Sequence, residues 1–217
     1  SRKNRVDFRF PVQYVIRPHQ DFRGFAGTIA SGGVRVGDEV MVLPSKLKSR
    51  VKSIQEYTTE RKEAVNGDAV ILTIEDEIDI SRGDMIVRSK NIPEVAREFE
   101  AVVCWMHEDT LREDREYIIM HNTRQVKALP NKLYYKINVD TLHREKTDEL
   151  QLNEIGRVRF TTAQPLFFDP YQMNNSTGSF IVIDPVSMVT VGAGMIRGVQ
   201  ADEDIIEAPV KKERSPN

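Results

Sequence analysis

The sequence predicts an all-β protein made of two consecutive small β-barrels. Helical periodicity is nearly absent, and the apolar residues instead occur in short runs, often alternating with polar ones, which is typical of strands. Turn-forming dipeptides separate several of these runs, because Gly32-Gly33 and Asn66-Gly67 tolerate the positive φ angles of tight turns. About six short strands in the first ~90 residues indicate a closed barrel, since closure removes the exposed sheet edges that invite aggregation.

The first barrel is predicted to start with a strand over residues 8–16, where every second residue is apolar: Phe8, Phe10, Val12, Tyr14 and Ile16. Pro11 indicates an edge position or a strand start, because proline cannot donate a hydrogen bond to a ladder. Further strands are expected over residues 24–30, 39–43, 50–57, 69–74 and 84–88, with a tight hairpin at Gly32-Gly33.

A second series of strand-like segments predicts the second barrel. These segments are residues 99–106, 116–121, 124–129, 132–140, 156–162, 179–183 and 188–196, with a hairpin at Asn122-Thr123. Asn91-Ile92-Pro93-Glu94 is polar and interrupted by proline, as a linker between barrels would be. The predicted domains are therefore residues 1–92 and 93–199. Residues 200–217 are rich in charge and contain Pro209 and Pro216, which predicts a disordered or linker-like tail.

Composition excludes several classes of protein. The chain has 217 residues with 31 Lys and Arg against 33 Asp and Glu, a net charge of −2, which argues against a dedicated nucleic-acid binder. The single cysteine, Cys104, excludes an internal disulfide framework and a multi-cysteine zinc site. No apolar run is long enough to span a membrane as a helix, and the basic start is not followed by the apolar stretch of a secretory signal. These features predict a cytoplasmic protein without membrane contact.

No motif predicts catalytic, cofactor-binding or metal-binding residues. The spacing from Gly32 to Gly37 resembles a phosphate loop, but Asp38 and Glu39 follow it and would repel a phosphate. The glycines at 192, 194 and 198 precede a charged tail rather than open a helix, so they do not form a dinucleotide fingerprint. The four histidines show no metal-ligand spacing, and the acidic residues 75–79 lack the glycine-centred calcium loop. The sequence therefore indicates a binding or scaffolding segment.

The order of several short motifs resembles the second domain of translation-type GTPases such as elongation factor Tu. The motifs are the hairpin over residues 21–29, the Val36-Gly37-Asp38-Glu39-Val40 strand and the Arg82-Gly83-Asp84 turn. The segment Val191-Gly192-Ala193-Gly194 is similar to the final strand of the third domain of that protein. The resemblance implies barrels like domains 2 and 3 of elongation factor Tu.

A longer string is similar to the large GTPase subunit of bacterial sulfate adenylyltransferase. It comprises Asp21–Gly27, Leu152–Gly156, Pro165–Tyr171, Asn174, Thr177 and Gly178, and the resemblance covers about residues 8–197. The family couples GTP hydrolysis to the formation of adenylyl sulfate from ATP and sulfate. The resemblance implies that GTP and Mg belong to an N-terminal GTPase domain and that adenylyl transfer belongs to a separate small subunit.

None of the GTP-binding motifs of that family is present in this sequence. In particular, Asn131-Lys132-Leu133 is followed by Tyr134, where the family's N-K-x-D motif requires Asp. The resemblance therefore implies a fragment that follows the GTPase domain, with no catalytic, cofactor or metal residue of its own. Its expected partners are that GTPase domain and the small catalytic subunit, with no nucleic acid. The tail is also where some relatives carry a fused adenylyl-sulfate kinase.

We expect the partner interface at Phe22, Arg23 and Phe25, in the loop of the first hairpin. An exposed loop with a half-buried aromatic residue is the alternative at these positions. The sequence leaves two alternatives. The barrels could belong to a translation-type GTPase and contact tRNA or the ribosome, or the chain could be a stand-alone enzyme, which no motif supports. The first alternative predicts salt-sensitive RNA binding.

Overall fold

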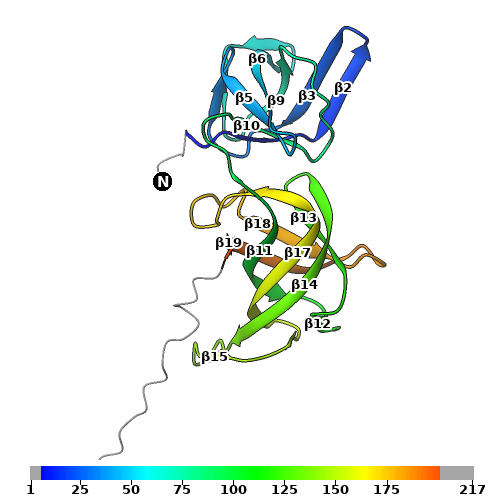
Figure 1. The fold of residues 1–217 in the computed structure, drawn as a ribbon, viewed down its shortest axis with the longest axis vertical. Coiled ribbons are helices and arrows are strands. Elements are labelled where there is room, and N and C mark those ends of the chain that lie inside the picture. Colours follow the sequence, from blue (N-terminus) through cyan, green and yellow to red (C-terminus); the bar gives the residue numbers. More distant parts are fainter. Residues whose placement is uncertain (1–5, 201–217) are drawn as a thin grey trace, which may run out of the picture.

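The described part of the chain contains two large curved β-sheets, one above the other in Figure 1, and two short two-stranded sheets. The computed structural model describes residues 6–200, and this part of the chain contains nineteen strands and no helix. We call the part built from β1 to β10 the N-terminal module and the part built from β11 to β19 the C-terminal barrel; each contains one large sheet and one short two-stranded sheet. The all-β prediction is confirmed, but the predicted closure of the first barrel is not found among residues 6–200, because its sheet ends at β1 and β2 without a ladder between them.

The N-terminal module is a half-barrel with the strand order β1-β10-β5-β6-β9-β3-β2, in which β7 pairs with β6 and β4 pairs separately with β8. Every ladder in it is antiparallel. The strands are β1 (Arg9–Pro11), β2 (Tyr14–His19), β3 (Phe22–Thr28), β4 (Gly33–Arg35), β5 (Glu39–Leu43), β6 (Leu47–Glu56), β7 (Thr59–Arg61), β8 (Glu63–Val65), β9 (Ala69–Ile74) and β10 (Met85–Arg88). Its core contains Phe8, Phe10, Phe25, Ile54 and Leu72.

The predicted first strand is divided in two. β1 pairs with β10, whereas β2 pairs with β3, and the chain crosses between them at Val12 and Gln13. There the amide of Val12 bonds the carbonyl of Asp84, while the amide of Gln13 bonds the carbonyl of Ala26. The predicted common face therefore ends at Val12: Phe8, Phe10 and Val12 are buried, but Tyr14 is 57% exposed.

The predicted hairpin at Gly32-Gly33 is wrong. β3 pairs with β2 and β9, while β4, which follows Gly32, pairs with β8. Only glycine suits position 32, because its φ is 72° and a Cβ there would lie 2.5 Å from the backbone nitrogen of Phe8. This glycine therefore allows the chain to pass close beneath β1 rather than to reverse its direction.

The C-terminal barrel is closed, because β13 pairs with β14 as well as with β18. The order around it is β13-β18-β19-β11-β17-β14; β15 extends β14, and β12 pairs with β16. The strands are β11 (Glu94–Trp105), β12 (Leu111–Arg112), β13 (Tyr117–His121), β14 (Arg124–Ile137), β15 (Arg144–Glu145), β16 (Glu149–Leu150), β17 (Ile155–Phe168), β18 (Ser179–Ile183) and β19 (Thr190–Gly198). Phe99 lies at the centre of the core, with the rings of Phe160, Phe168 and Phe180 each 5.6 Å away.

Two predicted strands, residues 124–129 and 132–140, are in fact the single strand β14. Pro130 lies inside it and is tolerated because the register with β17 shifts between Pro130 and Lys132, where the ladder is irregular. The predicted hairpin at Asn122-Thr123 is confirmed, since His121 pairs with Arg124 and Asn122 has a positive φ of 51°.

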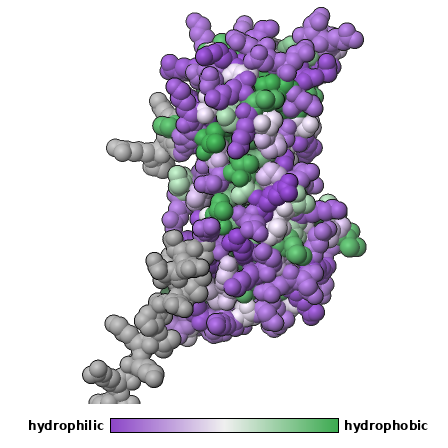
Figure 2. All heavy atoms as spheres, in the orientation of Figure 1, coloured by the Kyte–Doolittle hydropathy of each residue, from purple (hydrophilic) through white to green (hydrophobic). Residues whose placement is uncertain are grey.

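The predicted linker lies between β10, which ends at Arg88, and β11, which begins at Glu94. The domain limit at residues 92 and 93 stays a prediction. The predicted tail, residues 200–217, lies outside the described residues except for Gln200. Within residues 6–200 no helix is long and apolar enough to cross a membrane. The visible surface is mostly hydrophilic, with apolar side chains gathered in a few patches (Figure 2).

Candidate functional site: the hairpin loop and the junction between the sheets

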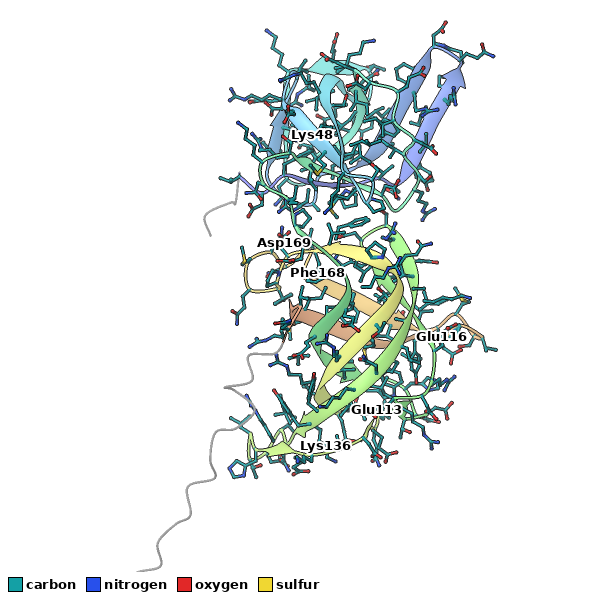
Figure 3. The ribbon with its side chains drawn as sticks, in the orientation of Figure 1. Lys48, Glu113, Glu116, Lys136, Phe168 and Asp169 are labelled. Atoms are coloured by element: carbon teal, nitrogen blue, oxygen red, sulfur yellow. The ribbon has the colours of Figure 1, made fainter. Side chains whose placement is uncertain are left out.

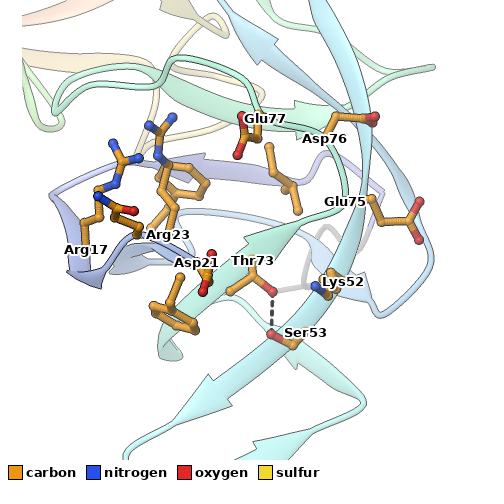
Figure 4. A pocket seen from close by; sticks show the side chains of 13 residues that line it. Arg17, Asp21, Arg23, Lys52, Ser53, Thr73, Glu75, Asp76 and Glu77 are labelled. Atoms are coloured by element: carbon orange, nitrogen blue, oxygen red, sulfur yellow. Dashed lines mark hydrogen bonds between the residues drawn. The ribbon is translucent and has the colours of Figure 1, made fainter.

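The predicted interface residues lie at the start of β3, beside a cavity of about 310 Å³ (Figure 4). Phe22 and Arg23 are half-buried, and the guanidinium of Arg23 donates to the carbonyl of Ile78 at 3.1 Å. Phe25 is only 1% exposed and packs in the core of the N-terminal module. Phe22 and Arg23 are therefore placed where a partner could touch them, whereas Phe25 supports the hairpin from inside.

The cavity beside this hairpin mixes charges of both signs. Its charged lining residues are Arg17, Arg23, Lys52, Asp21, Glu75, Asp76 and Glu77 (Figure 4). Ser53 and Thr73 share a short hydrogen bond on its floor, so neither hydroxyl is paired with a base that could activate it. Among residues 6–200, no group of three or more His, Cys, Asp and Glu is arranged to hold a metal ion. The cavity is lined mostly by charged and other polar side chains.

A second candidate site is the junction where the two sheets meet, and its centre is an ion pair between Arg9 of β1 and Asp169, which follows β17. The guanidinium nitrogens of Arg9 lie 3.0 and 3.1 Å from the two carboxylate oxygens. Arg9 is 1% and Asp169 6% exposed. The remaining Arg9 donors bond the backbone oxygen of Phe8 and both oxygens of Asn91. Such a bidentate pair, in which every guanidinium donor is bonded, fixes both the position and the orientation of one sheet relative to the other.

The loop after β17 supports this ion pair. Thr177 donates its hydroxyl hydrogen to Asp169 Oδ2 at 2.7 Å, and Asn174 donates to Ser31 Oγ of the N-terminal module at 2.8 Å. Asn174 Oδ1 in turn accepts the amides of Ser176 and Thr177. Gly178 is required here, because a Cβ would lie 2.4 Å from the Cα of Tyr171. The loop is thus held in one shape while its polar groups contact the other sheet.

Apolar contacts and a second ion pair complete the junction. Phe167 packs with Met41, Leu43, Met85 and Val87, which lie on the outer face of β5 and β10. The guanidinium of Arg124 lies 4.6 Å from the centre of the Phe167 ring and 3.5 Å from Asp84 Oδ1. Burial raises the pKa of Asp84 and lowers the pKa of Arg124, so this pair only partly offsets its desolvation.

His121 lies behind the junction and is fully buried. Its Nε2 is 2.6 Å from the carbonyl oxygen of Thr177. Since a carbonyl only accepts, Nε2 carries the hydrogen. Burial lowers the pKa of His121 below its ordinary value of 6.5, although the Thr177 carbonyl and Asp169 act in the opposite direction.

We expect a pH dependence from His121. With a lowered pKa, the folded protein binds fewer protons than the unfolded chain just below pH 6.5, so the stability from neutral His121 is complete above about pH 7. It is lost as the pH falls below 6.5, by up to about 1.4 kcal/mol per pH unit. In urea unfolding between pH 7 and 5, the free energy of unfolding should fall less steeply with decreasing pH for His121→Gln than for the unchanged protein. The exposed His143→Gln is the control, and equal slopes for His121→Gln and the unchanged protein would contradict the assignment.

The outer surface of the C-terminal barrel carries an apolar face. It surrounds a cavity of about 660 Å³ over β11, β13, β18 and β19. Its apolar members include Val102, Met120, Ile181 and Met195, none of which is fully buried. Outward-facing apolar residues clustered in this way mark surfaces that contact another protein.

The interface at Phe22 and Arg23 stays a prediction, and sequence reasoning missed the junction. Asp169, Asn174, Thr177 and Gly178 belong to the string that carried the family resemblance, yet no role followed from it. The apolar run of β5 was a second signal. Met41 and Leu43 are apolar on the face that points away from the core of the N-terminal module, which indicates that both faces are covered.

Comparisons with known proteins agree with the fold. Residues 98–197 match the family described as GTP-eEF1A C-terminal domain-like. The fold superposes on that of Sup35 complexed with GDP with a TM-score of 0.83, covering 92% of this chain and 49% of Sup35 at 18% identity.

Curated relatives share much higher sequence identity. Sulfate adenylyltransferase subunit 1 of Shewanella woodyi is 54% identical over 190 residues, which are 88% of this chain and 40% of that protein. The bifunctional enzyme CysN/CysC of Mycobacterium tuberculosis is 50% identical, over 89% of this chain and 33% of that protein. The chain thus spans less than half the length of these relatives. It is a homologue of sulfate adenylyltransferase subunit 1 that aligns with about 40% of that protein, and its residues 98–197 match the eEF1A C-terminal domain type.

Proposed function

We propose that this chain is the β-barrel portion of a sulfate adenylyltransferase subunit 1, and that it acts as a scaffold between domains and between subunits. In the full protein, a GTPase domain with GTP and Mg would couple hydrolysis to the formation of adenylyl sulfate, and a small subunit would transfer the adenylyl group. The protein would act in the cytoplasm. Curated relatives with about 50% identity support this function over a translation role.

The observation that carries the proposal is the buried Arg9–Asp169 pair between the sheets. A scaffold transmits motion only if its parts keep their relative position, because a displacement at one interface then becomes a rigid-body rotation at another. A pair held by two hydrogen bonds, with an apolar contact around Phe167, provides that stiffness.

Two surfaces remain for partners. The apolar face around Met195 suits the GTPase domain, since covering it would remove apolar side chains from water. Phe22 and Arg23 on the hairpin suit the small subunit, with Phe25 as their buried support. GTP can change the activity of the small subunit only if the contacts differ between nucleotide states.

The test is capture of the small adenylyl-transferring subunit by the full-length protein, by this chain alone and by full-length Phe22→Ala with Arg23→Ala. We expect the double variant to bind about tenfold more weakly, as for a central aromatic and arginine contact, and to lose coupling between GTP hydrolysis and adenylyl sulfate formation. Lys62→Ala, exposed on the same module, is the control. Equal capture and equal coupling by the double variant would reject the hairpin contact.

A further inference from the structure

The strand β2 is an uncovered edge of the N-terminal module. Among the described residues it pairs only with β3, so one side of its backbone has no partner strand. Tyr14 and Val15 on this strand are 57% and 39% exposed. The other end of the sheet, β1, is buried and bridged to Ser31, and the C-terminal barrel closes on itself. Proteins normally blunt such an edge, because it is a template for another strand.

A groove runs beside this edge. It has a volume of about 460 Å³ and lies between β2 and the segment 79–82, which is outside any strand. Tyr14 and Val15 line it from β2, and Ile80 and Ser81 line it from the opposite segment. The groove is thus bounded on one side by a backbone that can still form hydrogen bonds.

The charge around the groove is positive. Its charged residues are Arg17, Arg23, Arg82 and Asp79. Figure 4 shows the guanidinium groups of Arg17 and Arg23 beside each other, and both residues line this groove as well as the neighbouring cavity. No described residue pairs with Arg17, and Arg23 bonds only the neutral carbonyl of Ile78. Asp79 lines the same groove and Asp21 the neighbouring cavity, but no ion pair between either arginine and a carboxylate is found among the described residues. Two neighbouring guanidinium groups repel each other, and an anion between them would relieve that repulsion.

We propose that β2 accepts a short, extended, acidic segment of a partner protein as an added strand. The backbone of the segment pairs with the free side of β2, and its Asp or Glu side chains lie between Arg17 and Arg23. This mode of recognition takes its affinity from main-chain hydrogen bonds and its specificity from side-chain pockets. The inference rests on the proposed intersubunit contact at Arg23 and adds the chemistry of the partner.

The same features define the length and class of the segment. The register of β2 with β3 shifts between Ile16 and His19, and Pro18 has no amide hydrogen, so only about four residues can pair. A strand edge presents alternating amides and carbonyls that match a peptide backbone. RNA would use the arginines but leave these groups unpaired, so a protein segment fits better.

The probe is a fluorescein-labelled peptide of alternating Thr and Glu, about eight residues long, titrated with the purified chain and followed by fluorescence anisotropy. We expect saturable binding that weakens about tenfold in Arg17→Gln with Arg23→Gln. Lys46→Gln with Lys48→Gln removes the same charge from two exposed residues, one in the turn between β5 and β6 and one near the start of β6, and should bind as the unchanged chain does. Circular dichroism checks that both variants are folded.

Three further probes separate the causes. The same peptide with N-methyl groups on alternate amides, made in both registers, should fail to bind in at least one register, since methylation removes the strand hydrogen bonds. A Thr and Lys peptide should not bind. Any of three results would overturn the proposal. The first is binding of both methylated peptides, and the second is no binding of the Glu peptide. The third is preferred binding of a labelled oligouridylate, if Arg17→Gln with Arg23→Gln abolishes that binding. Subunit capture by the full-length protein with no peptide binding would remove this inference alone, whereas peptide binding without capture would remove only the proposed function.

Discussion

Replacing Asp169 by Ala should destabilise the protein by about 3–5 kcal/mol, the cost of leaving one member of a buried ion pair without its partner. Arg9 would keep its charge inside the junction with only neutral oxygens of Phe8 and Asn91 around it. Thr177 would lose the acceptor of its hydroxyl at the same time. The loss is a large part of the 5–15 kcal/mol that ordinarily separates folded from unfolded chains. Urea unfolding followed by circular dichroism measures it.

The double variant Arg9→Met with Asp169→Leu serves as the control. It removes both charges and keeps apolar volume at the junction, so it should recover most of the lost stability. If Asp169→Ala alone costs less than about 1 kcal/mol, the pair is exposed in solution and the junction is looser than described.

The second large effect is expected at Glu100, on the outer face of β11. The side chain is 0% exposed, and its Oε2 accepts hydrogen bonds from Arg157 at 2.8 and 3.0 Å. Tyr134 donates its hydroxyl to Oε1 at 2.8 Å. Burial by itself would lower the pKa of Arg157, but the bonds to Glu100 and Tyr135 raise it. Glu100→Gln should therefore cost about 3 kcal/mol, since the buried guanidinium loses its counter-charge.

Glu98→Gln provides a matched comparison two residues away on the same strand. Glu98 pairs with Arg159 at 2.7 Å but lies at the surface, where water and salt screen the attraction. The substitution Glu98→Gln should therefore change the midpoint of urea unfolding little. Both variants are followed by the fluorescence of Trp105, which is buried in the same barrel. Equal effects of the two substitutions would show that burial does not decide the contribution of these pairs.

The sequence predicted most strands because alternation and turn residues are local signals. It failed where partners far apart in the chain decide the structure. Residues 8–16 are predicted as one strand, yet the chain changes its partner from β10 to β3 at Val12 and Gln13. Residues 124–129 and 132–140 are predicted as two strands, but they form the single strand β14, in which a register shift accommodates Pro130. Such events depend on the neighbouring strand, which a local pattern does not contain.

The candidate sites show the same limit. Alternation places Arg9 on the outward face of β1, where a charged residue is ordinarily solvated, and only the approach of Asp169, 160 residues away, makes it buried. In β3 the reverse holds: Phe25 was expected at an interface, but the alternation of the strand turns its ring inward. Contact surfaces on a barrel are therefore predictable only once the docking of the second sheet is known.

The central claim is that the two sheets move as one body, and a distance between spin labels tests it most directly. Lys48→Cys on the N-terminal module and Glu116→Cys on the C-terminal barrel, both labelled in Figure 3, place labels on opposite sides of the junction at Asp169. Cys104→Ser removes the one native thiol. Double electron–electron resonance should give a single narrow distance distribution, which broadens when Asp169→Ala is added. A broad or two-peaked distribution with the junction intact would contradict the scaffold account.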